Sequence, residues 1–409
     1  MINQDWPSPA DIVDAYRRCR LKKAFSFHQA QFESKLGQNL LDLHHEISTR
    51  TYKPTRSIYF VVERPKPREI FASHFRDRIV HHLIVRKLEP WWEGRFIHSN
   101  FACRKGRGTH AALRNFLSQI NRTSRGNQFP VWVLKLDIEA FFPTISRSAL
   151  AALLLRNIRH PALRYLVETT YSHDSRKSYR RVIGPGGSNA KVDPQRSWFS
   201  RPPEQGIPIG NLTSQFGANV YLNGMDHFIQ RELKPMAYQR YMDDLTLFSN
   251  DPESLAAMIE PIDEWLKTHR GQRLNRAKTF LGDAAKGVEY LGYKIVGRVG
   301  QPPEIHVPPK KKWEFVAAVR KIEQRGSPVP RKLHTLALRK SDDETKRSLA
   351  SLNSRLGHLK HAKSYRLRKE TLTRLGERTS LKTISLKPLQ SFEWKFYSFG
   401  RRFQKIRLR

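Results

Sequence analysis

The 409-residue sequence contains only two cysteines, Cys19 and Cys103, and they do not form a Cys-x-x-Cys pair. Neither a zinc module nor a disulfide-stabilised scaffold is therefore predicted, and a reducing compartment suits the chain. No uninterrupted apolar stretch approaches 18 residues, so no transmembrane helix is expected. Residues 1–7 do not have the pattern of a signal peptide. We therefore expect a cytoplasmic protein with no membrane partner.

Acidic residues are scarce. The chain has 37 Asp and Glu against 74 Lys and Arg, which gives a net charge of +37. A surplus of this size favours a polyanionic partner, and nucleic acid is the better candidate because no membrane segment is expected. Residues 301–409 alone hold 28 Lys and Arg against 9 Asp and Glu. We expect this basic segment to follow a nucleic-acid backbone, with an affinity that falls steeply as salt rises.

Helical and extended patterns both occur along the chain. Apolar spacing predicts helices over residues 9–50, 75–93, 110–119, 146–170 and 212–233, and a further helix capped by Asp251 with Pro252 at its first position. Extended segments are predicted over residues 55–71, 130–137, 237–249 and 287–297. Residues 172–205 are basic and rich in Gly and Pro, which favours a long loop or a flexible insertion.

The most informative motif is Tyr241-Met242-Asp243-Asp244, because aromatic and β-branched residues flank the two acids. The pattern predicts a β-hairpin with carboxylates at its tip, an arrangement that is costly unless a cation binds there. Asp342-Asp343 serves as an internal comparison, since no apolar run flanks that pair and a solvated turn is expected. A single acid elsewhere in the chain, Asp137, follows the apolar strand at residues 131–136. Asp137 is either a further metal ligand or an exposed cap for the helix beyond it.

Taken in order, these motifs resemble those of reverse transcriptases. Asp137 with Phe141-Phe142 resembles the first catalytic motif of that family, and residues 241–244 resemble the second. The resemblance covers residues 55–295. Within it, most family members carry Gln-Gly and later Ser-Pro, where this chain has Ile209-Gly210 and Ser214-Gln215. These substitutions are typical of the reverse transcriptases of diversity-generating retroelements, and residues 357–366 resemble the thumb of that group.

The resemblance implies an α+β fold arranged as a right hand. We expect an N-terminal helical extension over residues 1–54, fingers over 55–130, a ferredoxin-like palm over 131–300 that includes the insertion at 172–205, and a basic helical thumb over 301–409. A bacterial or phage-encoded cytoplasmic protein is implied.

The same resemblance implies RNA-directed DNA synthesis, in which a primer 3′-OH, or an RNA 2′-OH, attacks the α-phosphate of a dNTP. Two Mg²⁺ ions are expected, with Mn²⁺ as a substitute. The implied catalytic residues are Asp137, Asp243 and Asp244, and Ile138 joins them in the metal site. Such ions stabilise both the attacking and the leaving oxygens of phosphoryl transfer.

Further site residues follow from position within the motifs, each with a simpler alternative. Lys66 and Arg68 suit a triphosphate or form an ordinary basic turn. Phe142 is the expected steric gate against a ribose 2′-OH or else a core aromatic. Gly210 can let a primer or base lie against the backbone, or simply precedes a helix. Lys278 matches a lysine thought to assist pyrophosphate departure, or is a surface lysine. Gln215 is included in the nucleotide site.

Nucleic-acid contacts are expected at two places. Arg104, Lys105 and Arg107 lie in a Gly-rich loop that can approach a template phosphate, although a solvated basic loop is the competing interpretation. Tyr290, Gly292 and Tyr293 resemble the primer grip, and Tyr293 could equally be a core residue. The expected partners are template RNA, an RNA/DNA hybrid and a small basic accessory protein that forms a pentamer.

Ile209 replaces a glutamine that can hydrogen-bond the incoming nucleotide. Discrimination that depends on apolar fit alone is on the order of 1–3 kcal/mol, so we expect low fidelity. The resemblance to the diversity-generating group implies that the errors occur mainly opposite template adenines. The alternatives are another bacterial reverse transcriptase of intron, retron or phage-defence type, or a catalytically silent RNA-binding scaffold. The three intact acids argue against the scaffold.

Overall fold

A computed structural model of the protein describes residues 6–21, 26–63, 66–182 and 191–324, together with 351–352, 354–359, 361–364, 366–368 and 370–371. The chain forms two compact units, one of Met1–Ala112 with Val133–Leu281 and the other of Leu113–Trp132 with Gly282–Arg409. Much of the segment predicted as the thumb, including the Asp342-Asp343 pair, lies outside the described residues. None of the helices in the described ranges is long and apolar enough to cross a membrane.

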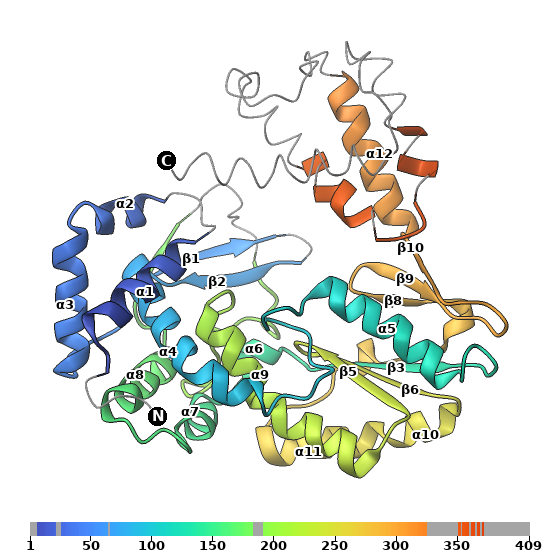
Figure 1. Cartoon of the computed structure of the whole chain (residues 1–409), viewed down its shortest axis with the longest axis horizontal. Coiled ribbons are helices and arrows are strands. Elements are labelled where there is room, and N and C mark those ends of the chain that lie inside the picture. Colours follow the sequence, from blue (N-terminus) through green and yellow to red (C-terminus); the bar gives the residue numbers. More distant parts are fainter. Residues whose placement is uncertain are drawn as a thin grey trace. The chain divides into compact units, whose positions relative to one another are not determined.

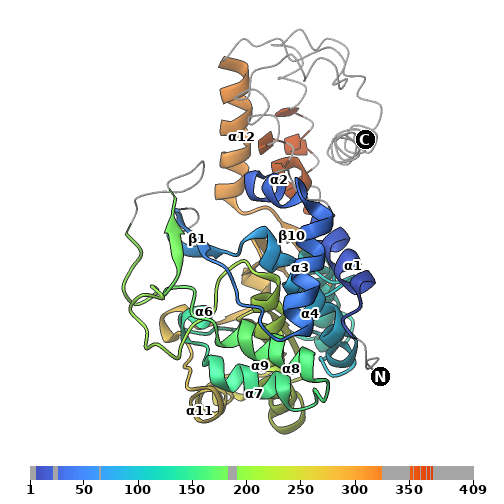
Figure 2. The ribbon, with the colours of Figure 1, turned by 90° about the vertical axis from the view of Figure 1, so that its left-hand side faces the viewer.

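The N-terminal extension of the first unit consists of three helices (Figures 1 and 2). They are α1 (Pro9–Arg20), α2 (Phe27–Glu33) and α3 (Leu36–Ser48), so the helical pattern predicted over 9–50 is interrupted twice. Ser8 closes a capping box with Asp11 at the start of α1. Helix α1 packs on α4 (Phe75–Glu93), which has the predicted bounds.

A small sheet of the first unit contains β1 (Ser57–Val62), β2 (Arg68–Ala72) and β4 (Tyr179–Arg181) in the order β2-β1-β4. Strands β1 and β2 are antiparallel, and β4 pairs with β1 in parallel. Strand β4 belongs to the segment predicted as a flexible insertion. Trp198, from the same segment, packs edge-on against Phe71 at 5.0 Å between ring centroids. The described part of residues 172–205 is largely irregular, as expected for a long loop, but β4 and Trp198 anchor it to this unit.

The main sheet has the order β5-β6-β3-β7, formed by β5 (Ala237–Tyr241), β6 (Asp244–Ser249), β3 (Trp132–Asp137) and β7 (Phe280–Asp283). Helix α9 (Leu212–Phe228) packs on α4, on α7 (Arg147–Leu155) and on α11 (Ile259–Arg270). A π-helical turn, η1 (Ile229–Leu233), extends α9 to the predicted end.

The helix predicted over 146–170 is two helices, α7 and α8 (Pro161–Ser172), because the chain turns before Pro161, which opens the second. They lie side by side in Figure 2. Asp251 caps α10 (Pro252–Ala257), as predicted, by accepting the N–H groups of Glu253 and Ser254. The short helix α6 (Phe141–Thr144) follows β3, and the short helix η2 (Arg276–Lys278) follows α11.

The second unit includes most of α5 (Thr109–Thr123), the turn η3 (Ala284–Lys286), a sheet of order β10-β9-β8 and helix α12 (Pro309–Gln324). The strands are β8 (Val288–Tyr290), β9 (Tyr293–Val296) and β10 (Glu304–His306). Strands β8 and β9 form the pair predicted near residues 287–297. Phe116 of α5 packs against Tyr290 at 4.8 Å between centroids. The mixture of helices and largely antiparallel sheets confirms the predicted α+β class.

Candidate active site

Three acids meet at one end of the main sheet. Strands β5 and β6 form the predicted hairpin, and Tyr241 pairs with Asp244 as its last rung. Met242 and Asp243 make the two-residue connection, with Met242 in the left-handed region at φ 56°. Strand β3 is the neighbour of β6 and ends at Asp137. Strands β3, β5 and β6 lie together in Figure 1, so the sheet order brings Asp137 to the hairpin, as the sequence predicted. Of the two hairpin acids, only Asp243 lies in the turn, and Asp244 is the first residue of β6.

The acids repel one another electrostatically. Burial, with added repulsion from Asp244 and Asp137, raises the pKa of Asp243 to about 7. Burial also raises the pKa of Asp244, against the opposing charge of Lys135. The ammonium group of Lys278 pairs with a carboxylate oxygen of Asp137. Among the described residues, Lys135 and Lys278 thus neutralise the negative charge of these acids only in part.

A divalent metal ion suits the chemistry of these donors. Carboxylate oxygens are hard ligands of the kind that Mg²⁺ and Mn²⁺ prefer. In the described part of the chain, no group of three or more His, Cys, Asp or Glu has the spacing of a ready metal centre. Lys278 instead lies against Asp137. Binding of a divalent ion would relieve the repulsion at Asp243 and would require Lys278 to move away from Asp137.

Asp137 and Asp243 face a cavity of about 970 Å³ in the first unit. This volume suits a nucleotide. Eight of the residues singled out from the sequence line the cavity: Lys66, Arg68, Asp137, Ile138, Phe142, Ile209, Asp243 and Lys278. They come from the β1–β2 connection, β2, the end of β3, α6, the loop before α9, the hairpin and η2. The fold therefore collects in one place residues that are more than 200 positions apart in the sequence.

Phe142 and Ile209 are two of the apolar residues in the cavity wall. Phe142 is partly buried and meets Phe141 edge-on at 5.3 Å between ring centroids, whereas Phe141 is 3% exposed and belongs to the core. The carbonyl of Phe142 accepts the N–H of Ile207 at 3.1 Å, which holds α6 against the loop that carries Ile209.

Other predicted site residues do not line this cavity. Asp244 is the first residue of β6, and Gln215 lies in the first turn of α9. Gly210 lies in the loop before α9 with φ 100°. Gly210 has open space where a Cβ would be, so its φ angle, rather than crowding, favours glycine.

The basic loop after α4 requires a correction at Arg104. Its guanidinium is buried, pairs with Glu93 at 2.6 Å and donates to the carbonyls of Ile97 and Asn100 at 2.7 and 2.8 Å. Arg104 therefore holds the loop together and does not present a charge to a template. Arg107 lies over the Phe101 ring at 5.6 Å, and Lys105 is exposed.

Tyr290, Gly292 and Tyr293 lie in the second unit. Both tyrosine side chains are core residues, which is the alternative left open for Tyr293 and shows that neither side chain is exposed to a ligand. Tyr293 stacks on His358 at 4.1 Å between centroids and donates its hydroxyl to the His358 carbonyl at 2.9 Å. Gly292 occupies the hairpin turn at φ 84°, where the His358 ring lies 3.2 Å from the position of a Cβ.

The sequence reasoning missed the support beneath the turn that carries Asp243. Arg240 and Asp226 are both fully buried and form a two-pronged ion pair, with two nitrogen–oxygen distances of 2.7 Å. A further N–H of Arg240 donates to the carbonyl of Met242 at 2.9 Å, and Tyr238 donates to Asp226 at 2.8 Å. Arg240 thus ties α9 to the backbone of the turn. The signal in the sequence was one charged residue within each of two elements, Asp226 in α9 and Arg240 in β5.

We expect Asp226→Asn to lower the free energy of unfolding by about 3 kcal/mol or more, because it leaves Arg240 buried without a full counter-charge. Denaturant unfolding of the metal-free protein measures the loss. Glu264→Gln is the matched control, since its ion pair with Lys267 is exposed and contributes less than about 1 kcal/mol. Equal stability of the two variants would contradict a structural role for the Arg240 pair.

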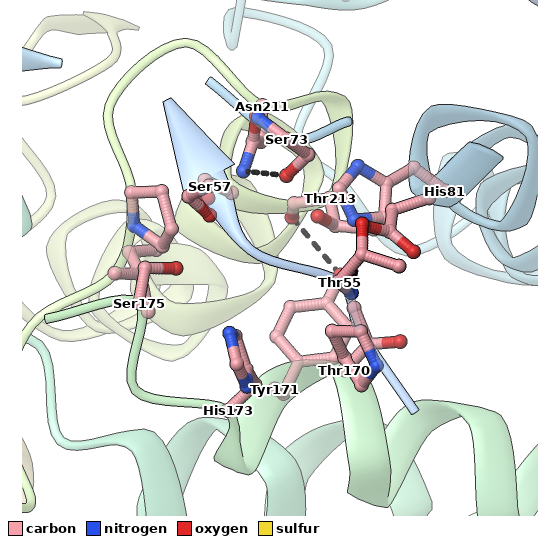
Figure 3. A pocket seen from close by; sticks show the side chains of 15 residues that line it. Thr55, Ser57, Ser73, His81, Thr170, Tyr171, His173, Ser175, Asn211 and Thr213 are labelled. Carbon is pink, nitrogen blue, oxygen red and sulfur yellow. Dashed lines mark hydrogen bonds between the residues drawn. The ribbon is translucent and has the colours of Figure 1, made fainter. Parts of the chain in front are cut away.

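A second, much smaller chamber of about 30 Å³ lies behind the loop that carries Ile209 (Figure 3). Within it, the Asn211 amide donates to the Ser73 hydroxyl at 2.8 Å and the Tyr171 hydroxyl donates to the Thr213 carbonyl at 2.9 Å. Burial lowers the pKa of the lining residue His81 to about 4, so this imidazole is neutral. The chamber has room for one or two water molecules and not for a nucleotide. The Asn211–Ser73 hydrogen bond joins the end of β2 to the start of α9. The larger cavity remains the candidate site.

Residues 62–295, which contain all the cavity walls, match the family model described as reverse transcriptase (RNA-dependent DNA polymerase). Among curated relatives, Protein YkfC of Escherichia coli (strain K12) is 24% identical over 330 residues, covering 71% of this chain and 81% of YkfC. Nuclear intron maturase 1, mitochondrial, of Arabidopsis thaliana is 20% identical over 316 residues, covering 59% of this chain and 44% of the maturase. The chain thus spans most of YkfC and less than half of the plant protein.

Proposed function

Because the chain belongs to the reverse transcriptase family, and is therefore an RNA-directed DNA polymerase with a right-hand fold, we propose that it is of the diversity-generating type and makes error-prone cDNA from a template RNA. The observation that carries the proposal is the apolar side chain of Ile209 in the wall of the cavity that Asp137 and Asp243 also line. An incoming nucleotide in that cavity meets carboxylates on one side and an apolar contact on the other.

In the proposed reaction, a primer 3′-OH attacks the α-phosphate of a dNTP and pyrophosphate leaves. Asp137, Asp243 and the backbone of Ile138 would hold two divalent ions, which stabilise the attacking and leaving oxygens when bound. Lys66 and Arg68 hold the triphosphate, and Phe142 packs against the sugar. Lys278, which pairs with Asp137 in this structure, is released to approach the leaving pyrophosphate. Asp244 acts from the hairpin as a supporting charge.

The proposed low fidelity follows from the chemistry of position 209. An isoleucine can exclude volume but cannot donate or accept a hydrogen bond. A site that recognises its substrate only by apolar fit rejects a wrong base pair weakly. We propose that misincorporation is concentrated opposite template adenines.

We expect Ile209→Gln to lower the error rate opposite adenine by about tenfold, because a polar contact to the nucleotide is restored. The measurement is sequencing of cDNA made by wild type and variant on one defined RNA. Ile209→Leu, which keeps the apolar contact, is the control and should leave the errors in place. An unchanged spectrum in the glutamine variant would remove Ile209 as the cause.

Primer extension on a defined RNA with Mg²⁺ and dNTPs tests the proposed function as a whole. Substitutions concentrated at template adenines support the diversity-generating type. Accurate cDNA would move the protein towards the intron, retron or defence types, of which the first has some support in the name of the plant relative. Absence of any product, even with the cognate RNA and the accessory protein, would favour the silent scaffold.

Two partners complete the proposal. Template RNA and the RNA/DNA hybrid suit the net charge of +37, and a small pentameric accessory protein is proposed on the resemblance of residues 206–215 to the diversity-generating group. The division into extension, fingers, palm and thumb at residues 54, 130 and 300 also remains a proposal.

A further inference from the structure

One wall of the nucleotide cavity comes from the segment that follows β4. Gln195, Arg196 and Trp198 line the cavity together with Lys66 and Arg68. Nothing in the sequence motifs marked this segment as part of the site. It belongs to the predicted insertion and lies outside the short blocks that carry the family resemblance.

The segment is fixed to β2 through a buried carboxylate. Glu69 is 8% exposed and accepts two hydrogen bonds of 2.6 Å, one from the Ser197 hydroxyl and one from the backbone N–H of Trp198. Hydrogen bonds of this length to a buried carboxylate are strong and directional. Since Glu69 directly follows Arg68, the attachment point is adjacent to a residue proposed to hold the triphosphate.

The other edge of the segment is fixed to the loop that carries Ile209. The indole N–H of Trp198 donates to the carbonyl of Gln205 at 2.7 Å. Gly206 has φ 91°, and a Cβ at this position would lie 1.9 Å from the indole nitrogen of Trp198. Only glycine at position 206 therefore allows Trp198 to lie against the loop. The Trp198 side chain thus joins the segment after β4 to the loop that carries Ile209.

A third attachment stiffens the base of the segment. Arg176 pairs with Asp174 at 2.8 Å and donates to the carbonyls of Trp198 and Arg201 at 2.9 and 2.7 Å. Its guanidinium also lies over the Trp198 ring, 5.2 Å from the centroid. These contacts hold the backbone on the C-terminal side of Arg196.

Arg196 lines the cavity, and its guanidinium is available to bind a ligand. Its backbone N–H donates to the Asp193 carbonyl at 2.8 Å, but no described residue accepts a hydrogen bond from its guanidinium or forms an ion pair with it. Two other cations of the same cavity are neutralised, Arg276 by Glu260 and Asp263 and Lys278 by Asp137. A free guanidinium in a cleft beside Lys66 and Arg68 suits a phosphate group, which it can bind through two parallel hydrogen bonds.

We propose that Arg196 is a further nucleotide-binding residue, which contacts the triphosphate of the incoming dNTP, and that Glu69 and Trp198 are positioning residues that hold it there. The inference rests on the proposed reaction in the cavity. It assigns to the insertion a direct part in substrate binding.

The test compares single-nucleotide incorporation by wild type, Arg196→Gln and Lys191→Gln. Lys191 is the matched control, since it is exposed in the same segment but does not line the cavity. We expect the KM for dNTP to rise about tenfold in Arg196→Gln with kcat changed less than threefold, and inhibition by inorganic pyrophosphate to weaken in parallel. Arg196→Lys should recover part of the affinity. An unchanged KM, or an equal rise in Lys191→Gln, would overturn the proposal.

A second variant tests the positioning residues. Ser197→Ala removes one of the two bonds to Glu69 and leaves Arg196 in place, so the KM should rise about threefold, and Ser197→Thr should restore it. Direct titration of the same proteins with a non-hydrolysable dNTP analogue separates the proposed function from the proposed role of Arg196. If wild type binds the analogue but makes no DNA, the proposed function fails, while weaker binding by Arg196→Gln still supports this site and equal binding rejects it.

Discussion

Replacing Asp243 with asparagine is expected to reduce DNA synthesis by about 1000-fold or more and to leave RNA binding unchanged. The substitution removes a proposed metal-binding carboxylate from the tip of the hairpin, and metal-dependent stabilisation of the transition state accounts for several kcal/mol. RNA binding depends instead on the basic surface, which the change does not touch.

The same substitution is expected to stabilise the metal-free protein at pH 8. The pKa of Asp243 is raised to about 7, mainly by burial. Between about pH 4 and 7, the folded state holds a proton at Asp243 that the unfolded state has released, so stability falls as pH rises through this window. At pH 8 the full cost of the buried charge is present, with an upper limit of about 4 kcal/mol. Asparagine removes that cost, whereas below about pH 4 the two proteins should differ little.

Thermal unfolding in a chelator at pH 8 and at pH 4 measures this difference, and Asp42→Asn on the exposed face of α3 serves as the control. Added Mg²⁺ should raise the melting temperature of wild type at pH 8 and have little effect on Asp243→Asn. A variant that retains synthesis would refute the catalytic assignment. A variant that is less stable than wild type at pH 8 would show that Asp243 is not electrostatically strained.

The sequence predicted best those parts of the candidate site that consist of residues close together along the chain. The hairpin with Asp243 needs only apolar runs on both sides of two acids, and Asp137 needs only a strand that ends in a carboxylate. Sheet neighbours then bring the two together, and this adjacency could be inferred because a lone buried acid is costly.

The support of the site could not be predicted in the same way, because it consists of contacts between distant residues. Arg240 and Asp226 are 14 positions apart, and Glu69 and Ser197 are 128 apart. Arg104 was misjudged for the same reason, since the loop composition does not show that Glu93 and two carbonyls have already engaged its guanidinium. The aromatic residues Tyr290 and Tyr293 carry the family pattern, yet their burial depends on Phe116 and His358 from other segments.

The second large effect is expected at Phe142. Phe142→Val should raise the use of ribonucleotides relative to deoxyribonucleotides by about 10- to 100-fold, because the smaller side chain leaves room for a ribose 2′-OH. The backbone bond from Ile207 and the edge-on contact with Phe141 fix the position of the ring, so an rNTP cannot displace it easily. The measurement is the ratio of kcat/KM for one dNTP and its matching rNTP, which is insensitive to the fraction of enzyme that is folded.

Phe142→Tyr keeps the aromatic plate and should keep the discrimination, which makes it the control for the valine variant. The competing interpretation, in which Phe142 is only a core residue, predicts that valine lowers stability and slows both substrates equally. An unchanged ratio together with a lower melting temperature would support that interpretation. A changed ratio at similar stability is expected if the ring faces the sugar. Both rings border the cavity, but Phe142 is only partly buried, whereas Phe141 is 3% exposed and belongs to the core.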